Sequence, residues 1–207
     1  MTDDKTIEKL NTGKKIIEQK ILIIGDSKVD ISSFVSKLFN LPFNKKEGEV
    51  SNDSTNISFN IELNDYIINY EISHTSNENE IPIIISDLAE KLSLVIIVYS
   101  IENEKSFNNL KNLFCLIKGI NDLDKIIIKK NKTDLHYNKA FSKEKIEEFY
   151  KTNGIKTYLE ISTEDKKSVE ELTELINNIA IKRFELNESI KFENEKNEEK
   201  ETTCGCI

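Results

Sequence analysis

The sequence predicts an α/β fold: a mainly parallel six-stranded sheet with one antiparallel edge hairpin and helices on both faces. From residue 20 onward, short apolar runs alternate with segments whose apolar residues recur at helical spacing. Such alternation is typical of right-handed β-α-β units, in which parallel strands are covered by the connecting helices. With 207 residues, 38% of them hydrophobic, the chain is long enough to bury one core of ordinary size.

Three of the six predicted strands (20–25, 94–100 and 125–130) are continuous apolar runs, as expected for strands buried on both faces. Two others (56–63 and 66–72) alternate apolar and polar residues and are separated only by Asn64 and Asp65, which predicts a hairpin turn. The predicted strands, in order, are KILIIG (20–25), NISFNIEL (56–63), YIINYEI (66–72), LVIIVYS (94–100), KIIIKK (125–130) and TYLEIS (157–162).

Helical patterns separate most of these strands. The segments 32–40 and 104–118 carry apolar residues at helical spacing. A third helix is predicted to start at Ser142 and to end at Gly154. Ser168 and Glu171 form a capping-box pattern that predicts the start of a final helix.

The chain divides into a polar N-terminal extension (1–19), one folded domain (20–183) and a tail (184–207) that we expect to be flexible, because it is polar and mostly acidic. The charged N-terminus argues against a secretory signal, and Thr2 stands where N-myristoylation needs glycine. No apolar run approaches the length of a membrane span. A net charge of −8 argues against a nucleic-acid-binding protein.

The three cysteines indicate a cytosolic protein. Cys115 lies within a predicted helix, where a small buried hydrophobic side chain is expected rather than a reactive thiol. Cys204 and Cys206 lie in the last four residues, a spacing that fits neither a disulfide framework nor a zinc site.

The stretch ILIIGDSKVDISS (21–33) begins like a phosphate-binding loop of the form G-x-x-x-x-G-K-S/T. Gly25 and Ser32 have the required spacing, but Asp30 and Ile31 stand at the Gly-Lys positions. From the residues alone, the stretch is a phosphate cradle, the remains of one, or a chance match.

A second motif, NKTD, places Asn131, Lys132 and Asp134 directly after a buried strand. A carboxylate at Asp134 can accept two hydrogen bonds from the N1 and N2 donors of guanine, a pair that adenine does not offer. A polar turn rich in Asn, Lys and Asp is the alternative interpretation, since short motifs often match by chance.

Taken together, these motifs resemble the Ras superfamily of small GTPases, and most of all its Rab branch. GDSKVDISSFVSKLF is similar to the family's GDSGVGKSSLVxRF, and LVIIVYSIENEKSFNNL resembles the stretch through its fourth strand. NKTDL resembles its guanine motif, and FSKEKIEEFYKTNGIKTYLEIS the run into its last strand. The resemblance covers about residues 20–183 and implies a P-loop NTPase-like G domain that binds GTP or GDP with Mg²⁺.

The resemblance also implies roles for individual residues. The phosphate loop would be formed by Gly25, Asp26, Ser27, Lys28, Val29, Asp30, Ile31, Ser32 and Ser33. Guanine would be bound by Asn131, Lys132, Asp134, Ser162 and Thr163. Ser32 would ligate Mg²⁺, joined by Ser51 if that residue, rather than Val50, takes the position of the family's switch I threonine.

The departures from the family pattern fall mainly in the phosphate half of the site. Asp30 and Ile31 replace the Gly-Lys pair, and the segment from His74 to Glu78 replaces D-T-A-G-Q, so that Glu78 takes the usual place of the glutamine. In the last base-contacting loop, Glu164 replaces lysine. We expect weak or absent GTP hydrolysis, and no residue is assigned as catalytic.

The C-terminal CGCI predicts prenylation. Read as C-a-a-X, the acceptor is Cys204; read in the Rab manner, Cys204 and Cys206 both carry geranylgeranyl groups. Residues 185–203 are predominantly acidic and would be repelled by anionic lipid, which favours two lipid anchors over one.

Two functions follow from these observations. The first is a monomeric, divergent Rab-like GTP-binding protein of vesicle traffic, peripheral on endomembranes and bound by effector or escort proteins. The second is a pseudo-GTPase that recruits partners at membranes without a nucleotide cycle.

Overall fold

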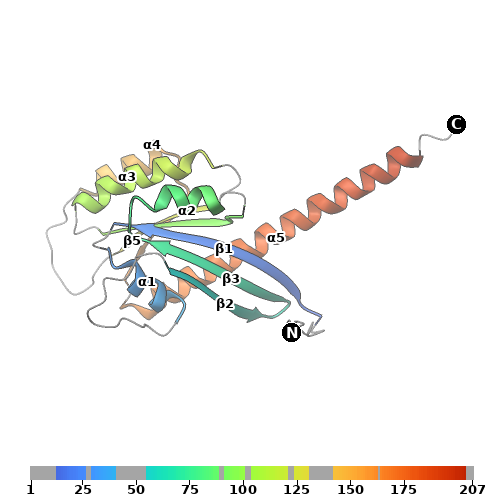
Figure 1. The fold of residues 1–207 in the computed structure, drawn as a ribbon, viewed down its shortest axis with the longest axis horizontal. Helices are drawn as coiled ribbons and strands as arrows, with labels where there is room; N and C mark the ends of the chain where they lie inside the picture. Colours follow the sequence, from blue (N-terminus) through green and yellow to red (C-terminus); the bar gives the residue numbers. More distant parts are fainter. Residues whose placement is uncertain are drawn as a thin grey trace, which may run out of the picture.

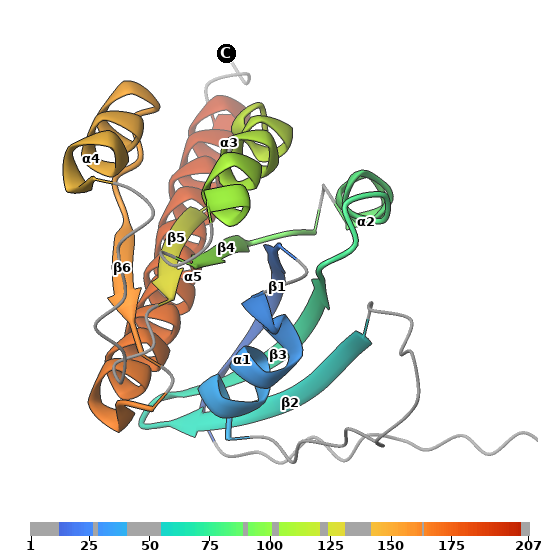
Figure 2. The ribbon, with the colours of Figure 1, turned by 90° about the vertical axis from the view of Figure 1, so that its left-hand side faces the viewer.

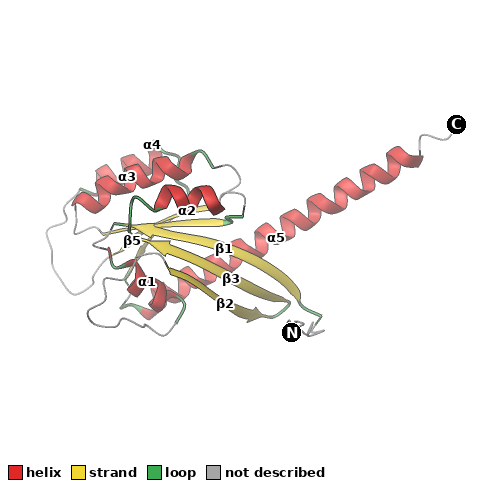
Figure 3. Ribbon diagram, in the orientation of Figure 1, coloured by secondary structure: helices red, strands yellow, loops and turns green. Residues whose placement is uncertain are grey.

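A computed structural model gives the fold shown in Figure 1. It describes residues 13–26, 29–40, 55–88, 91–100, 104–120, 124–130, 142–162 and 164–203. Within these ranges, a single sheet lies between two layers of helices (Figure 3).

The sheet has six strands in the order β2-β3-β1-β4-β5-β6. They are β1 (Lys15–Gly25), β2 (Thr55–Leu63), β3 (Tyr66–Thr75), β4 (Leu94–Ser100), β5 (Asp124–Lys130) and β6 (Tyr158–Ile161). Only the pairing of β2 with β3 is antiparallel, and the other four pairings are parallel. This arrangement confirms the predicted mainly parallel sheet with one antiparallel edge hairpin.

Helices cover both faces of the sheet, as predicted (Figure 2). They are α1 (Ile31–Leu38), α2 (Ile81–Leu88), α3 (Glu104–Lys118), α4 (Lys143–Thr152) and α5 (Lys166–Thr203). Alternation along β1 divides the core between the two faces, because successive side chains of a strand point in opposite directions. Ile21 and Ile23 pack with α1 and α5, whereas Leu22 and Ile24 pack with α2, α3 and α4.

Several local signals in the sequence have the predicted structural effect. Leu63 pairs with Tyr66 across the two-residue turn of the β2–β3 hairpin. Ser142 is the N-cap of α4, where its hydroxyl accepts a hydrogen bond from the Lys145 amide at 3.4 Å. Gly154, just beyond the helix, has a left-handed φ of 64°, a conformation that glycine adopts at little cost.

Two strands, β1 and β3, are several residues longer than the sequence predicted. β1 begins at Lys15 rather than at residue 20, so part of the expected N-terminal extension belongs to the sheet. The added residues pair with β3 from Tyr66 onward, and Ile17 is buried against α5. β3 continues to Thr75, so residues 73–75 form buried strand where a loop was expected.

The start of α5 differs from the capping-box prediction. Asp165 precedes the helix and accepts hydrogen bonds from the amides of Lys167 and Ser168 at 3.2 and 3.3 Å. Ser168 lies inside the first turn, where its hydroxyl donates to the carbonyl oxygens of Ser162 and Asp165. A carboxylate is the more favourable group at a helix N-terminus, because it also offsets the positive end of the helix dipole.

Most of the expected tail is helical: residues 184–203 continue α5, which projects from the domain (Figure 1). The helix continues because its base is anchored where Phe184 packs edge-on against Tyr66. The hydroxyl of Tyr66 also donates to the Glu185 carboxylate at 2.7 Å. Beyond this anchor the sequence is rich in Glu and Lys, which are good helix formers. This extension is about 30 Å long at about 1.5 Å per residue.

Cys115 is exposed on α3, so the prediction of a buried side chain was wrong. The neighbouring Phe114 and Ile117 point into the core, whereas Cys115 lies outside the stripe of helical positions that they define.

Alkaline pH should destabilise the fold through two tyrosines on the α4 side of the sheet. The hydroxyls of Tyr99 and Tyr150 lie 2.9 Å apart in the core. Burial raises the pKa of Tyr150 to about 12 and also raises the pKa of Tyr99 above its ordinary value. Because a tyrosine of the unfolded chain ionises near pH 10, the stability that each contributes is complete below about pH 10. It then falls by about 1.4 kcal/mol per pH unit as the pH rises toward 12.

Urea unfolding between pH 8 and 11.5 measures this slope, and absorbance at 295 nm follows ionisation in the folded protein. Tyr150→Phe should reduce the slope. Titration of all six tyrosines of the folded chain together near pH 10 would contradict the raised pKa values of Tyr99 and Tyr150.

Candidate functional site

The predicted phosphate loop lies at the carboxyl edge of the parallel strands, the usual ligand edge of such sheets. Gly25 ends β1, and α1 begins six residues later at Ile31. β3 ends at Thr75, and Ser162 directly follows β6. The fold therefore brings the ends of β1, β3 and β6 to one edge, as the resemblance implies.

Asp30 adopts a left-handed backbone conformation with φ 53° and ψ 63°, which the family's glycine at this position would adopt freely. It is also the N-cap of α1, where its Oδ1 accepts a hydrogen bond from the Ser33 amide at 3.4 Å. A helix N-terminus of this kind is where a phosphate group would be bound. Here the protein's own carboxylate lies at that position.

Ile31, at the lysine position, is a core residue. Its side chain is 3% exposed and packs with α5 and the sheet. It also lies directly over Gly25, where an added Cβ would come within 2.6 Å of Ile31 Cδ1 and closer still to the Val98 carbonyl oxygen. The position is therefore apolar and filled, and it offers no charge to an outer phosphate.

Asp26, the next residue after Gly25, is 8% exposed and is bound to α3. The side-chain amide of Asn109 donates to Asp26 Oδ2 at 2.6 Å and to Glu78 Oε1 at 2.8 Å. Two carboxylates from different parts of the site thus share one donor group. Glu78, at the family's glutamine position, points toward α3 through this bond.

The segment that precedes α2 is held by its own polar side chains. Thr75 Oγ1 donates to Glu80 Oε2 at 3.1 Å and accepts from the Asn77 amide at 3.0 Å. The Asn77 side chain donates to Glu80 Oε1 at 2.9 Å and accepts from the Asn79 amide at 3.1 Å. Residues 75–80 form a compact, hydrogen-bonded turn.

His74 stands where the family has the aspartate of D-T-A-G-Q. It is the second-last residue of β3, pairs in register with Ile23, and is 4% exposed. His74 thus lies in a strand that continues beyond its predicted end at residue 72. A buried imidazole replaces the carboxylate that would support the metal.

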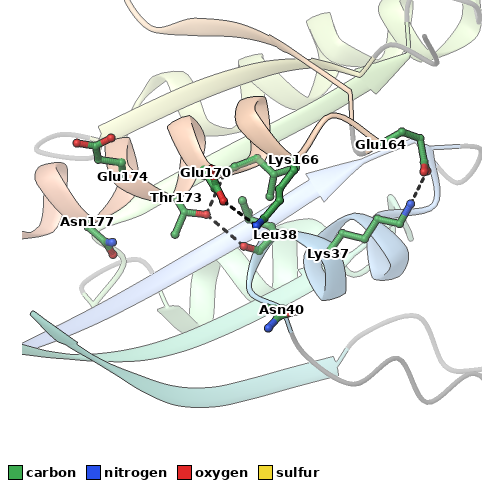
Figure 4. A pocket seen from close by; sticks show the side chains of 10 residues that line it. Lys37, Leu38, Asn40, Glu164, Lys166, Glu170, Thr173, Glu174 and Asn177 are labelled. Atoms are coloured by element: carbon green, nitrogen blue, oxygen red, sulfur yellow. Dashed lines mark hydrogen bonds and ion pairs between the residues drawn. The ribbon is translucent and has the colours of Figure 1, made fainter. Parts of the chain in front are cut away.

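The last loop is tied to α1. Ser162 is 7% exposed, and its hydroxyl accepts a hydrogen bond from the Glu164 amide at 3.3 Å. The Glu164 carboxylate forms an ion pair with Lys37 of α1 (Figure 4). The residue that replaces the family's lysine thus points toward α1.

A groove of about 820 Å³ lies between α1 and α5. Its rim carries the Lys37–Glu164 pair and a second pair, Lys166–Glu170, at 3.4 Å (Figure 4). Its cations already face carboxylates of the protein. The groove therefore does not offer the free positive charge that a nucleotide phosphate would need.

Several of the predicted site residues lie outside the described part of the chain. They are Ser27, Lys28, Ser51, Asn131, Lys132, Asp134, Thr163, Cys204 and Cys206. Across the residues that are described, no three His, Cys, Asp or Glu side chains are grouped so that they could hold a metal ion. The helices in that part of the chain also include none long and apolar enough to span a membrane.

Sequence reasoning missed two residues that shape this site, Asn109 and Lys37. Asn109 is a polar residue of a helix between the buried Phe107 and Leu110, and Lys37 is an ordinary surface cation. Both lie in stretches that resemble the family, but the resemblance assigned neither a role, and only the packing of α3 and α1 beside the loops reveals their contacts.

The described residues of the phosphate half do not fit a magnesium-bound triphosphate held in the manner of the family. The N-terminus of α1 carries the Asp30 carboxylate, the lysine position is the buried Ile31, and the metal-supporting position is the buried His74. Among the described residues, Ser32, in the first turn of α1, keeps the family's residue type at a metal-binding position.

Comparison with known proteins gives a consistent result. Residues 20–181 match the family model described as "Ras family". The chain is also 32% identical over 161 residues to the Ras-related protein Rab-8B of Homo sapiens, covering 73% of each chain. The Rab-8B proteins of Bos taurus and Pongo abelii match to the same extent.

The contact between Gly25 and Ile31 gives a stability prediction. Gly25→Ala should destabilise the protein by about 1–3 kcal/mol, because the added methyl group would overlap a backbone oxygen and a buried side chain. Gly119→Ala is the matched control, since a Cβ there would meet nothing within 4 Å. Urea unfolding of both variants measures the difference, and equal stability would contradict the packing described.

Proposed function

This chain is a member of the Ras family, and on that premise we propose that it is a Rab-like protein of membrane traffic that does not hydrolyse GTP efficiently. The observation that carries the proposal is the pair Asp30 and Ile31. One puts a carboxylate on the N-terminus of α1, and the other fills the lysine position with a buried apolar side chain.

Hydrolysis in this family depends on positioning and charge stabilisation around the γ-phosphate. A lysine at the loop makes charged hydrogen bonds to the outer phosphates, each worth roughly 1.5–3 kcal/mol. Ile31 makes none of them, and the Asp30 carboxylate repels a phosphate at the same place. Replacement of the lysine by Ile31 therefore lowers both the affinity for phosphates and the stabilisation of the transition state.

The residues that would position water are altered as well. Glu78 is bonded to Asn109 and adds negative charge at the place of the glutamine. His74 is buried at the place of the metal-supporting aspartate. Both changes act against hydrolysis independently of the phosphate loop.

For the C-terminus, we propose prenylation at Cys204 and Cys206, with the protein acting from the cytoplasmic side as a peripheral protein of endomembranes. α5 runs to Thr203, directly before the first of these cysteines. The helix extension is acidic and opposes binding to anionic lipid, so two lipid groups are required for stable anchoring. The membrane-bound domain would be recognised by effector or escort proteins as a monomer, and not by nucleic acid.

A second candidate function is a pseudo-GTPase that recruits partners without any nucleotide. Asp30 favours it, because a carboxylate that accepts from the Ser33 amide takes one of the donors that a phosphate would use. The two candidates differ in whether the purified protein contains guanine nucleotide. The NKTD motif favours the first candidate, the Rab-like protein that binds GTP or GDP.

Nucleotide content and turnover decide between them. We expect no phosphate release above the buffer rate when the protein is incubated with GTP and Mg²⁺, because Ile31 supplies no positive charge to the γ-phosphate and Asp30 adds a negative one. Denaturing the purified protein and identifying released nucleotide by chromatography then separates the candidates. Stoichiometric GDP or GTP supports the first, and an empty pool with no heat on titration with GDP and Mg²⁺ supports the second.

The variant Asp30→Gly/Ile31→Lys restores the family's pair and should increase nucleotide affinity at least tenfold. Asp30→Asn is the matched control, because asparagine also tolerates the left-handed conformation but lacks the charge. Rapid stoichiometric phosphate release by the unaltered protein would show that the proposal is wrong.

Mass spectrometry of the protein from a eukaryotic host tests the anchor. We expect two geranylgeranyl groups, falling to one in either Cys204→Ser or Cys206→Ser, and membrane association lost with both changes. Cys115→Ser controls for modification elsewhere, since that thiol is also exposed. A single prenyl group on Cys204 in the unaltered protein would support the C-a-a-X interpretation instead.

A further inference from the structure

Asn109 joins three parts of the domain that the sequence separates widely. Its side-chain amide is bonded to Asp26, in the predicted phosphate loop, and to Glu78, in the turn before α2, at 2.6 and 2.8 Å. Asn109 itself belongs to α3, whose neighbouring Leu110 is fully buried in the core. The packing of α3 therefore fixes the position of the Asn109 side chain, and its two hydrogen bonds fix the positions of the Asp26 and Glu78 carboxylates.

The two carboxylates would repel each other without this amide between them. Asp26 is 8% exposed, so its charge depends on protein donors more than on water. Hydrogen bonds from a neutral donor to a charged acceptor are among the stronger ones in proteins. The bridge therefore keeps the Glu78 carboxylate close to Asp26, although repulsion between the two carboxylates would otherwise move them apart.

The turn that contains Glu78 is held together by hydrogen bonds of its own. Thr75, Asn77 and Glu80 are joined by side-chain hydrogen bonds, and the Ile81 amide donates to the Asn77 carbonyl oxygen at 3.3 Å. Ile81, at the start of α2, is fully buried. Holding Glu78 therefore holds both the turn and the first residue of α2.

We propose that the Asp26–Asn109–Glu78 bridge replaces the γ-phosphate as the contact that holds this segment, so that residues 75–81 keep one conformation with or without nucleotide. In GTPases generally, the corresponding switch segment is ordered by contacts to the γ-phosphate and Mg²⁺ and is released on hydrolysis. Here an asparagine of α3 supplies the contact. Asn109 is a positioning residue, and it contacts no nucleotide.

This inference rests on the proposed function. A segment whose conformation is held by the protein itself does not change when GTP is hydrolysed, as expected of a protein that does not act through GTP hydrolysis. A ligand shifts a conformational equilibrium only by the difference between its affinities for the two states. When the bridge holds one state regardless of ligand, nucleotide has no second state to select. The surface formed by α2, which includes the exposed Ile83, is then presented to partners at all times.

Amide hydrogen exchange of the full-length protein tests the bridge. In Asn109→Ala, peptides covering residues 74–81 should exchange at least tenfold faster than in the unaltered protein, since the two carboxylates lose their shared donor. Asn108→Ala is the matched control: the neighbouring residue is exposed on the same helix, and its exchange should stay within twofold. A non-hydrolysable GTP analogue with Mg²⁺ should leave the exchange of residues 74–81 in the unaltered protein within twofold.

Two results overturn the proposal: an Asn109→Ala protein that exchanges at the unaltered rate, or an unaltered protein whose residues 74–81 are protected more than twofold by the nucleotide analogue. If peptides of β1 and β4 also exchange faster in Asn109→Ala, the fold itself is weakened. Glu78→Ala, which breaks only the side of the bridge toward the turn, then decides by the same criterion. Nucleotide content and phosphate release test the proposed function separately. Efficient GTP turnover by a protein with an intact bridge would contradict the proposed function alone. Absence of turnover in a protein without the bridge would contradict this inference alone.

Discussion

The packing of Ile31 onto Gly25 is the contact on which the candidate site depends. No other residue type fits at Gly25, because Ile31 Cδ1 and the Val98 carbonyl oxygen occupy the space of a Cβ. Ile31 is in turn the first residue of α1, so its burial fixes where the helix starts relative to β1 and β4. Asp30 must then take the left-handed conformation that connects loop and helix, and its carboxylate is brought onto the helix N-terminus.

From this contact, the electrostatics of the edge follow. A lysine at position 31 would carry a charge that must reach solvent or a phosphate, whereas isoleucine is stabilised by the core itself. In the described part of the loop, the charged side chains are the carboxylates of Asp26 and Asp30, and each is bonded within the protein: Asp30 to the Ser33 amide, and Asp26 to Asn109. Glu164 is likewise paired with Lys37. These three carboxylates therefore have their hydrogen-bond or ion-pair partners within the protein, without a bound ligand.

The sequence predicted most of the fold because strand periodicity, the Asn64–Asp65 turn and the Ser142 cap are local signals. It failed where tertiary contacts decide: β1 is longer because β3 is available to pair with it, and residues 184–203 are helical because Phe184 and Glu185 are anchored on Tyr66. At the site, the spacing of Gly25, Asp30 and Ile31 located the altered positions. The same residues could not show that Ile31 is buried or that Asn109 joins Asp26 to Glu78, since those contacts come from other elements.

The loss of the lysine and the presence of the Asn109 bridge are physically connected. A switch segment without a γ-phosphate contact would have to bear the entropy of ordering alone. The bridge and the Thr75–Asn77–Glu80 hydrogen bonds supply that order from inside the protein. It follows that restoring a glycine and a lysine at positions 30 and 31 repairs phosphate binding without restoring a switch. The segment becomes responsive to the ligand only when Asn109 also releases Glu78.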